Sequence, residues 1–285
     1  MADASPRTLG DVVGVLEQTY PLAWAEDWDR VGLVVGDPAA PVRSVLLAVD
    51  PTLDVVREAA GHDLLVTHHP LLLRGASALP TTTGKGAAVT GLIRSGTALW
   101  CGHTNVDRSS LGTVGAWIRA LDLHDVGPLA AGPSAREETV AAHGSRLVGL
   151  GAVGSLPAVT TVRELATRIA ATVPATAQGV RWTGDAERPV HRVAVCPGAG
   201  DSCLADAAAS GADVYVTSDL RHHPALEHVE SAADADAVPA LIDVAHSASE
   251  ALWLPLAREL LADVLPELAV HVSEASTDPW SGRVG

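Results

Sequence analysis

The sequence predicts an α/β protein with two similar, intertwined halves from an internal duplication, arranged in three layers on mixed sheets. Short apolar runs alternate along the chain with stretches of helical pattern, which is typical of α/β folds. The second half repeats the order of the first, and 47% of the 285 residues are hydrophobic, enough for a large packed core. We expect a first half at 1–127, a connector with a strand and a helix at 128–189, and a second half at 190–285.

In the first half, three apolar runs predict buried strands, and two stretches between them predict helices. Thr52 is placed to cap the first helix and Gly61 to end it, because a Thr hydroxyl accepts an amide hydrogen bond and Gly tolerates a left-handed backbone. The expected strands are 45–49, 64–66 and 98–101, and the expected helices are 52–60 and 86–95.

The connector and the second half continue this plan. A strand is expected at 147–153, and the pair Thr161 and Glu164 forms a capping box at the start of a helix. The stretches 127–139 and 181–189 are expected to be loops, since they are polar or rich in Gly and Pro. Further on we expect strands at 193–196, 214–216 and 240–244, a turn at 198–201 and a helix at 202–210.

Two matches between the halves indicate the duplication. Residues 60–67 resemble residues 210–217, and both carry Gly-x-Asp before an apolar strand that ends in Thr. Residues 103–107 resemble residues 246–250, since both begin with His and end four residues later with a carboxylate. Gly-x-Asp before a strand is common in α/β folds, but the second match, at nearly the same offset, favours duplication.

Composition narrows the functional classes. The formal net charge of −15 repels phosphate backbones, so nucleic-acid binding is not expected, whereas carboxylates suit a cation site or a solvated surface. We expect a cytoplasmic protein without membrane contact, because there is no signal peptide and no apolar stretch of about 18–20 residues. The odd number of cysteines and the lack of a Cys-x-x-Cys pair predict buried thiols in a reducing compartment for Cys101, Cys196 and Cys203.

A pair of adjacent histidines is the first candidate for metal chemistry. His68 and His69 follow the expected strand 64–66, at the sheet edge where open α/β sheets bind ligands. Neighbouring residues of an extended segment point in different directions, so the two imidazoles can face two different ions. Pro70 favours an extended backbone at His69. By itself the pair also fits two polar loop histidines.

Two further pairs join an imidazole and a carboxylate four residues apart. They are His103 with Asp107 and His246 with Glu250, each after an expected strand. On a helical turn each pair shares a face and can converge on one cation, and a Glu can bridge two ions. Taken alone, Asp107 also fits a helix cap, and the second pair also fits a helix surface.

The combined pattern predicts a site for two divalent ions. Nitrogen and oxygen ligands without thiolates suit zinc, iron, manganese, nickel or cobalt, and adjacent histidines fit two neighbouring ions. The predicted metal ligands are His68, His69, Asp107, His246 and Glu250.

Seven short motifs in a fixed order carry a family resemblance: 28–37, 67–70, 103–107, 198–200, 217–220, 243–250 and 278–280. In them the sequence resembles the Nif3-like family of dinuclear metal-centre proteins, whose members are also named GTP cyclohydrolase 1 type 2 homologs. The resemblance implies that the five predicted ligands hold two divalent ions per chain, with Glu250 bridging them and His103 close by. It also implies a ring-shaped homohexamer with the metal sites facing an inner cavity.

Three positions depart from the family pattern. Arg30 stands where Asn is common, and Ser218 and Ala245 each stand where Gly is common. None of the three removes a predicted ligand. The presence of Arg30 in place of Asn is expected to change substrate preference.

Two classes of function fit these residues. The first is a metal-dependent hydrolase acting on a nucleotide or related small molecule, with His103 or His223 as the acid–base group. His222, His223 and Pro224 echo the first His-His-Pro motif, although they also fit a polar loop left by the duplication. The second class is a non-enzymatic metal-binding ring protein that stores or delivers metal or joins protein partners.

A triphosphate substrate has little support among the residues themselves. There is no Gly-rich loop of the Walker type and no basic cluster. The cations near the motifs are Arg74, Lys85 and Arg221.

Overall fold

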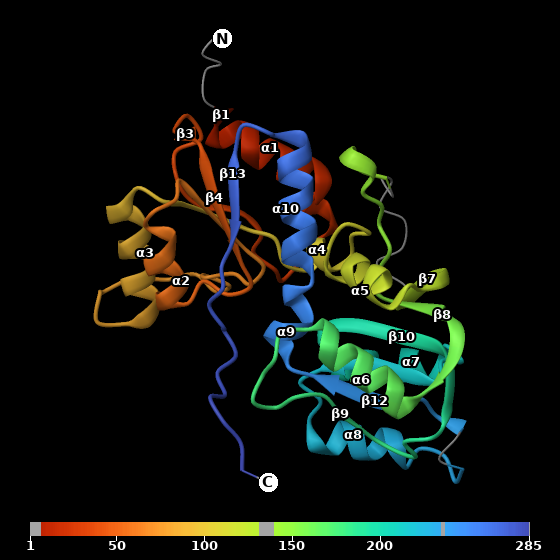
Figure 1. Cartoon of the computed structure of the whole chain (residues 1–285). Helices are drawn as coiled ribbons and strands as arrows, with labels where there is room; N and C mark the ends of the chain where they lie inside the picture. Colours follow the sequence, from red (N-terminus) through yellow and green to blue (C-terminus); the bar gives the residue numbers. More distant parts are fainter. Residues whose placement is uncertain (1–6, 131–139, 235–236, 285) are drawn as a thin grey trace. The chain divides into compact units, whose positions relative to one another are not determined.

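The computed structural model describes residues 7–130, 140–234 and 237–284, and it divides into two compact units (Figure 1). Unit 1 comprises the described parts of Met1–Val106, Glu138–Arg146 and Leu254–Thr277. Unit 2 comprises the described parts of Asp107–Glu137, Leu147–Trp253 and Asp278–Gly285. The chain therefore passes between the units several times.

Unit 1 is built on a five-stranded mixed sheet in the order β13-β4-β5-β6-β2. The first four strands are parallel, and β2 runs antiparallel to β6. A separate two-stranded antiparallel sheet pairs β1 (Arg7–Thr8) with β3 (Pro41–Val42). The strands of the main sheet are β13 (Ala269–Val272), β4 (Ser44–Ala48), β5 (Leu64–Thr67), β6 (Ala98–Cys101) and β2 (Gly32–Val35).

Helices cover both faces of this sheet. The helices α2 (Leu53–Ala59) and α3 (Gly84–Ser95) pack against one face, through a core that includes Leu46, Leu65 and Leu99. Strand residues of the opposite parity are buried as well, which requires cover on the second face. There Figure 1 shows α1 (Leu9–Thr19) and α10 (Trp253–Val264), the latter in unit 1 from Leu254 onward.

Unit 2 is built on a six-stranded mixed sheet in the order β7-β8-β10-β11-β12-β9. The strands β10, β11 and β12 are parallel, and the flanking strands are antiparallel to their neighbours. The strands are β7 (His124–Ala130), β8 (Leu150–Thr161), β10 (Pro189–Ala199), β11 (Val214–Ser218), β12 (Ala240–Val244) and β9 (Arg181–Trp182).

Two cores lie on the two faces of this sheet, so unit 2 has three layers. The helices α5 (Thr113–Leu121) and α6 (Val162–Thr172) pack on one face through residues such as Trp117. The helices α7 (Leu204–Ala209) and α8 (His222–Val229) pack on the other face. The short helices α4 (Thr104–Asp107) and α9 (His246–Ala251) follow strands β6 and β12.

The two sheets repeat the same arrangement of strands, as the predicted duplication requires. Three parallel strands are followed at one edge by an antiparallel strand, namely β4-β5-β6-β2 in unit 1 and β10-β11-β12-β9 in unit 2. Asp63 accepts hydrogen bonds from the amides of Arg43 and Ser44 at 2.8 and 3.0 Å. Asp213, its counterpart, accepts them from the amides of His191 and Arg192, both at 2.8 Å.

Several elements differ from the sequence-based expectations. The strands expected at 147–153 and 193–196 are β8 and β10, which are longer because they pair with each other. The expected loop 181–189 contains the two-residue strand β9, which pairs with β12. Of the expected loop 127–139, residues 127–130 belong to β7, and the rest lie outside the described residues.

The compact units follow different boundaries from the predicted halves at 1–127 and 190–285. The expected connector 128–189 contributes β8 to the sheet of unit 2, since β8 bonds to β10. The segment Leu254–Thr277 returns to unit 1, where β13 pairs with β4. No helix in the described ranges has the length and apolarity needed to cross a membrane; α3 and α10, for example, have 12 residues each.

Candidate metal-binding site

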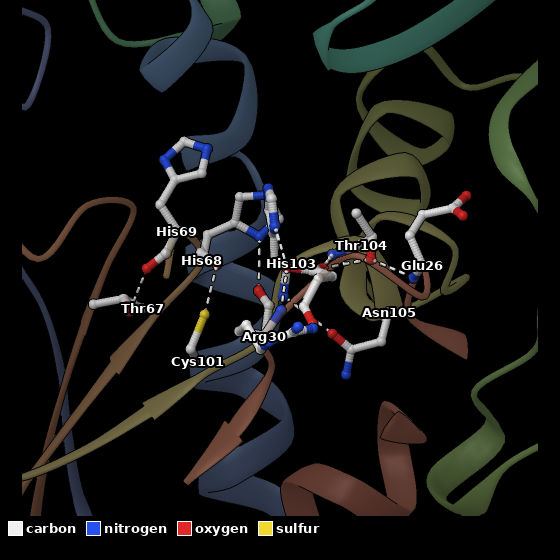
Figure 2. Close-up of polar contacts among 11 residues, drawn as sticks. Glu26, Arg30, Thr67, His68, His69, Cys101, His103, Thr104 and Asn105 are labelled. Atoms are coloured by element: carbon white, nitrogen blue, oxygen red, sulfur yellow. Dashed lines mark hydrogen bonds and ion pairs between the residues drawn. The ribbon is translucent and has the colours of Figure 1, made fainter. Parts of the chain in front are cut away.

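His68 and His69 lie at the carboxyl end of β5, as predicted, and hydrogen bonds fix their backbone. The His68 and His69 amides donate to the Val49 carbonyl at 3.1 and 2.9 Å. The Cys101 thiol donates to the His68 carbonyl at 3.2 Å, and the Thr67 hydroxyl donates to the His69 carbonyl at 3.0 Å (Figure 2). Burial raises the pKa of the Cys101 thiol, so it keeps the proton that it donates.

The His68 ring is fully buried, and its contacts select one tautomer. Its Nδ1 lies 2.9 Å from the carbonyl oxygen of Gly102. A carbonyl only accepts hydrogen bonds, so Nδ1 carries the proton and Nε2 is the nitrogen able to bind a cation. A ligating histidine is typically held in this way by an acceptor behind its second nitrogen.

Two other histidines, His69 and His103, have a carboxylate beside their Nδ1 atom in place of the carbonyl. The His69 Nδ1 lies 2.7 Å from an oxygen of Asp50, which follows β4. The His103 Nδ1 lies 2.9 Å from Asp29, whose other oxygen accepts from the Thr104 amide at 3.0 Å and the Thr104 hydroxyl at 2.5 Å. Such carboxylates orient an imidazole and make its other nitrogen more basic.

Asp29 stays ionised despite its burial. Desolvation raises the pKa of Asp29, but the hydrogen bonds from His103 and Thr104 and the positive charge that His103 can carry outweigh this effect. The resulting pKa lies well below the ordinary value. Asp29 is thus a fixed negative charge that orients the His103 ring.

The three histidines of unit 1 form one cluster. The ring of His68 lies 5.1 Å from that of His69 and 5.3 Å from that of His103, and His69 and His103 lie 5.5 Å apart, centroid to centroid. One ring nitrogen of each lies within 4.8 Å of the others, which is a suitable spacing for a cation. Figure 2 shows how they gather at the strand ends, with Arg30 beside them donating to the Asp29 carbonyl.

The candidates in unit 2 include the predicted pair at the start of α9. The His246 Nε2 lies 2.8 Å from an oxygen of Glu250, four residues later on the same helix. The His246 Nδ1 lies 2.7 Å from Asp219, which follows β11. Carboxylates therefore face both ring nitrogens, and the Nε2 atom and the Glu250 oxygen lie close enough to bind one metal ion.

Asp107 is the second buried carboxylate of unit 2. It is 8% exposed and accepts a 2.6 Å hydrogen bond from the Thr113 hydroxyl. One of its oxygens lies within 4.8 Å of an oxygen of Glu250, which is 2% exposed. Two buried carboxylates at this distance repel each other unless a proton or a cation lies with them. The donor set therefore fits a divalent cation.

Gly198 leaves room for the side chains of Glu250 and His246. A Cβ atom at Gly198 would lie 2.5 Å from a Glu250 oxygen and 3.3 Å from the His246 Nε2. Its φ of +71° also favours glycine. The Thr217 hydroxyl donates to the Gly198 carbonyl at 3.1 Å and holds the loop in place. Gly198, the first residue of the motif 198–200, therefore lies against the Glu250 carboxylate.

His223 belongs to none of the possible ligand groups found among the described residues. His223 is exposed on the first turn of α8, with its ring 5.1 Å from that of His222. Cys101, Cys196 and Cys203 are buried free thiols, as predicted. The contacts of Asp29, Asp50 and Asp219 with the histidines were not predicted. The signals in the sequence were that Asp29 and Asp219 lie in the family motifs 28–37 and 217–220 and that Asp50 and Asp219 follow strands.

The family match covers most of the chain. The model of the Duf34/NIF3 family (NGG1p interacting factor 3) matches residues 7–279. A Streptomyces coelicolor protein named GTP cyclohydrolase 1 type 2 homolog is 45% identical, over 98% of this chain and 95% of its own length. A Mycobacterium bovis protein of the same name is 35% identical, with 96% of each chain covered.

Solved structures share the fold. A Bacillus cereus protein related to NIF3 superposes with a TM-score of 0.84 at 22% identity, over 97% of this chain and 99% of its own. A hypothetical protein from Staphylococcus aureus superposes with a TM-score of 0.82 at 27% identity, with the same coverage. From the sequence match and the shared fold together, the chain belongs to the DUF34/NIF3 family.

Proposed function

We propose that this protein is a metal-dependent hydrolase that acts on a nucleotide or a related small molecule. The proposed metal ligands are the five predicted from the sequence: His68, His69, Asp107, His246 and Glu250. The proximity of two buried carboxylates, Asp107 and Glu250, is the observation that carries the proposal. A divalent cation would offset their charges, and the histidines supply nitrogen ligands that suit zinc, iron, manganese, nickel or cobalt.

The substrate class comes from the relatives. Several are named GTP cyclohydrolase 1 type 2 homologs, which supports hydrolysis of a purine nucleotide or a similar ring compound. We propose two ions per chain and assembly into a homohexamer, as the family resemblance implies.

The chain's own residues have distinct parts in such a reaction. Bound divalent ions lower the pKa of coordinated water and stabilise developing negative charge. Asp50 and Asp219 hold His69 and His246 in the orientation needed for binding. His103, backed by the ionised Asp29, is suited to accept a proton and return it to a leaving group. His223 remains the second candidate for this acid–base role.

Substitution of Glu250 tests the proposal. The purified protein should contain about two divalent ions per chain, as in two-metal hydrolases. Glu250→Gln should lose most of this metal and at least about 100-fold of any turnover found in a nucleotide screen, while the oligomer persists. Elemental analysis, the screen and size-exclusion chromatography measure these outcomes. Glu227→Gln, an exposed glutamate on α8, is the matched control.

Other results would change the conclusion. A protein purified without metal and without affinity for any of the five ions would refute the proposed site. Full metal content with no turnover of any nucleotide would favour the non-enzymatic, metal-binding alternative. His68→Ala extends the test, and it should also lower the metal content, since His68 is one of the five proposed ligands.

A further inference from the structure

A pocket of about 340 Å³ lies in unit 1 at the carboxyl ends of two parallel strands. Its walls come from the segment after β4, the segment after β5 and the start of α3. Open α/β sheets bind ligands at this edge, and the volume falls within the range of about 300–1,000 Å³ that is usual for small-molecule sites.

The pocket adjoins the candidate metal ligand His69. Asp50 lines the pocket and is also the carboxylate 2.7 Å from the His69 Nδ1. Pro70, which directly follows His69, lines it as well. A molecule bound in the pocket would therefore extend to the side of His69.

The lining combines an apolar surface with a single cation. Pro51, Leu53, Leu71 and Ala88 contribute apolar area. Among the residues that line it, Lys85 carries the only positive charge. Asp50 carries a negative charge beside His69, so an anionic group is repelled from that end and attracted to Lys85.

One lysine matches one phosphate better than it matches a triphosphate. Proteins hold a triphosphate with a Gly-rich loop, a lysine and Mg²⁺ together, and this pocket offers only the lysine. The ammonium of lysine binds phosphate as a point charge, and the proposed nucleotide substrate carries such a group. The net charge of −15 also disfavours highly charged anions.

We propose that Lys85 is the phosphate-binding residue of a substrate site, and that the substrate is a nucleoside monophosphate or a similar phosphomonoester. Its phosphate contacts Lys85, its body lies on the apolar wall, and its reactive end points toward His69. This inference rests on the proposed hydrolase function for the direction of the substrate.

Calorimetric titration of the purified protein with GMP, guanosine and GTP tests the inference. GMP should bind about tenfold more tightly than guanosine, and GTP should bind no more tightly than GMP. Lys85→Met should bind GMP only as weakly as guanosine, and Lys85→Arg should keep most of the difference. Arg94→Met, an exposed cation on the last turn of α3 that does not line the pocket, should behave like the unaltered protein.

Elemental analysis of each variant separates this inference from the proposed function. If metal content and turnover persist while Lys85→Met binds GMP normally, the hydrolase proposal stands and the phosphate site is refuted. Undetectable GMP binding, GTP binding tenfold tighter than GMP, or equal losses in Lys85→Met and Arg94→Met would also refute it. A lysine-dependent preference for GMP in protein without metal or turnover would support the phosphate site and count against the hydrolase.

Discussion

Gly198 shows how a residue without a side chain determines the chemistry around it. The Glu250 carboxylate and the His246 ring occupy the space where any other residue would place its Cβ atom. In addition, the positive φ disfavours L-residues at this position. The candidate site in unit 2 therefore depends on the backbone of the β10 end as well as on its ligands.

Gly198→Ala should displace Glu250 and weaken metal binding at least about tenfold, equivalent to about 1.4 kcal/mol of binding free energy, and so lower the metal content of the purified protein. Gly184→Ala is the control, because Gly184 has a φ of +79° and no heavy atom within 4 Å of the added Cβ. Elemental analysis of both variants measures the effect. Equal metal content in the two would show that the close approach to Glu250 is unimportant.

For single residues, the sequence predicted which side chains are candidate metal ligands, but it did not predict the carboxylates that contact them. His68 and His69 were identifiable because they follow an apolar strand, and the His246 and Glu250 pair because four residues span one helical turn. The carboxylates behind the rings were not predicted, because Asp50 and His69 lie 19 positions apart. Nothing local in the sequence indicates such a contact.

Helix α6 shows what local sequence specifies at the scale of an element. The Thr161 hydroxyl accepts from the Glu164 amide at 3.2 Å, and Glu164 accepts from the Thr161 amide at 3.1 Å, as the predicted capping box requires. Strand β9 is the opposite case. Its two residues extend only because they pair with β12, about 60 positions further along the chain, so a loop was predicted instead.

Loss of this cap should destabilise the protein measurably. Thr161→Ala removes the acceptor for the Glu164 amide and should lower the free energy of unfolding by about 1 kcal/mol. Denaturant titration followed by circular dichroism measures it. Thr172→Ala, at the other end of α6, should stay within about 0.5 kcal/mol of the unaltered protein, since its exposed hydroxyl donates to the Arg168 carbonyl of its own helix. Matching losses in both variants would argue against a capping effect.

Across the whole molecule, the two sheets share their order of parallel strands, as the duplication predicted. The boundaries of the compact units could not be predicted, because they depend on long-range pairing such as that of β13 with β4. The amino-acid composition does not indicate that the chain returns to its first sheet after completing the second.

The shared aspartates allow a matched test of the duplication. Asp63→Asn and Asp213→Asn should each lower the free energy of unfolding by about 1–3 kcal/mol, because each weakens two hydrogen bonds to a charged acceptor. Asp63→Asn should cost more, since Asp63 also accepts from the Ser44 hydroxyl at 3.1 Å. Denaturant titration compares them. A measurable cost in only one variant would show that the two positions no longer have equivalent roles.

Within each repeat, these aspartates and the candidate metal ligands lie at opposite ends of the strands. Both accept from amides just before the parallel pairing of β4 and β10 begins, whereas the histidines follow the ends of β5 and β12. Residues at the chemically active end of either repeat can therefore differ without loosening the opposite end. The two repeats do differ there, since Ser218 and Asp219 stand in the second repeat at the positions matching His68 and His69 in the first.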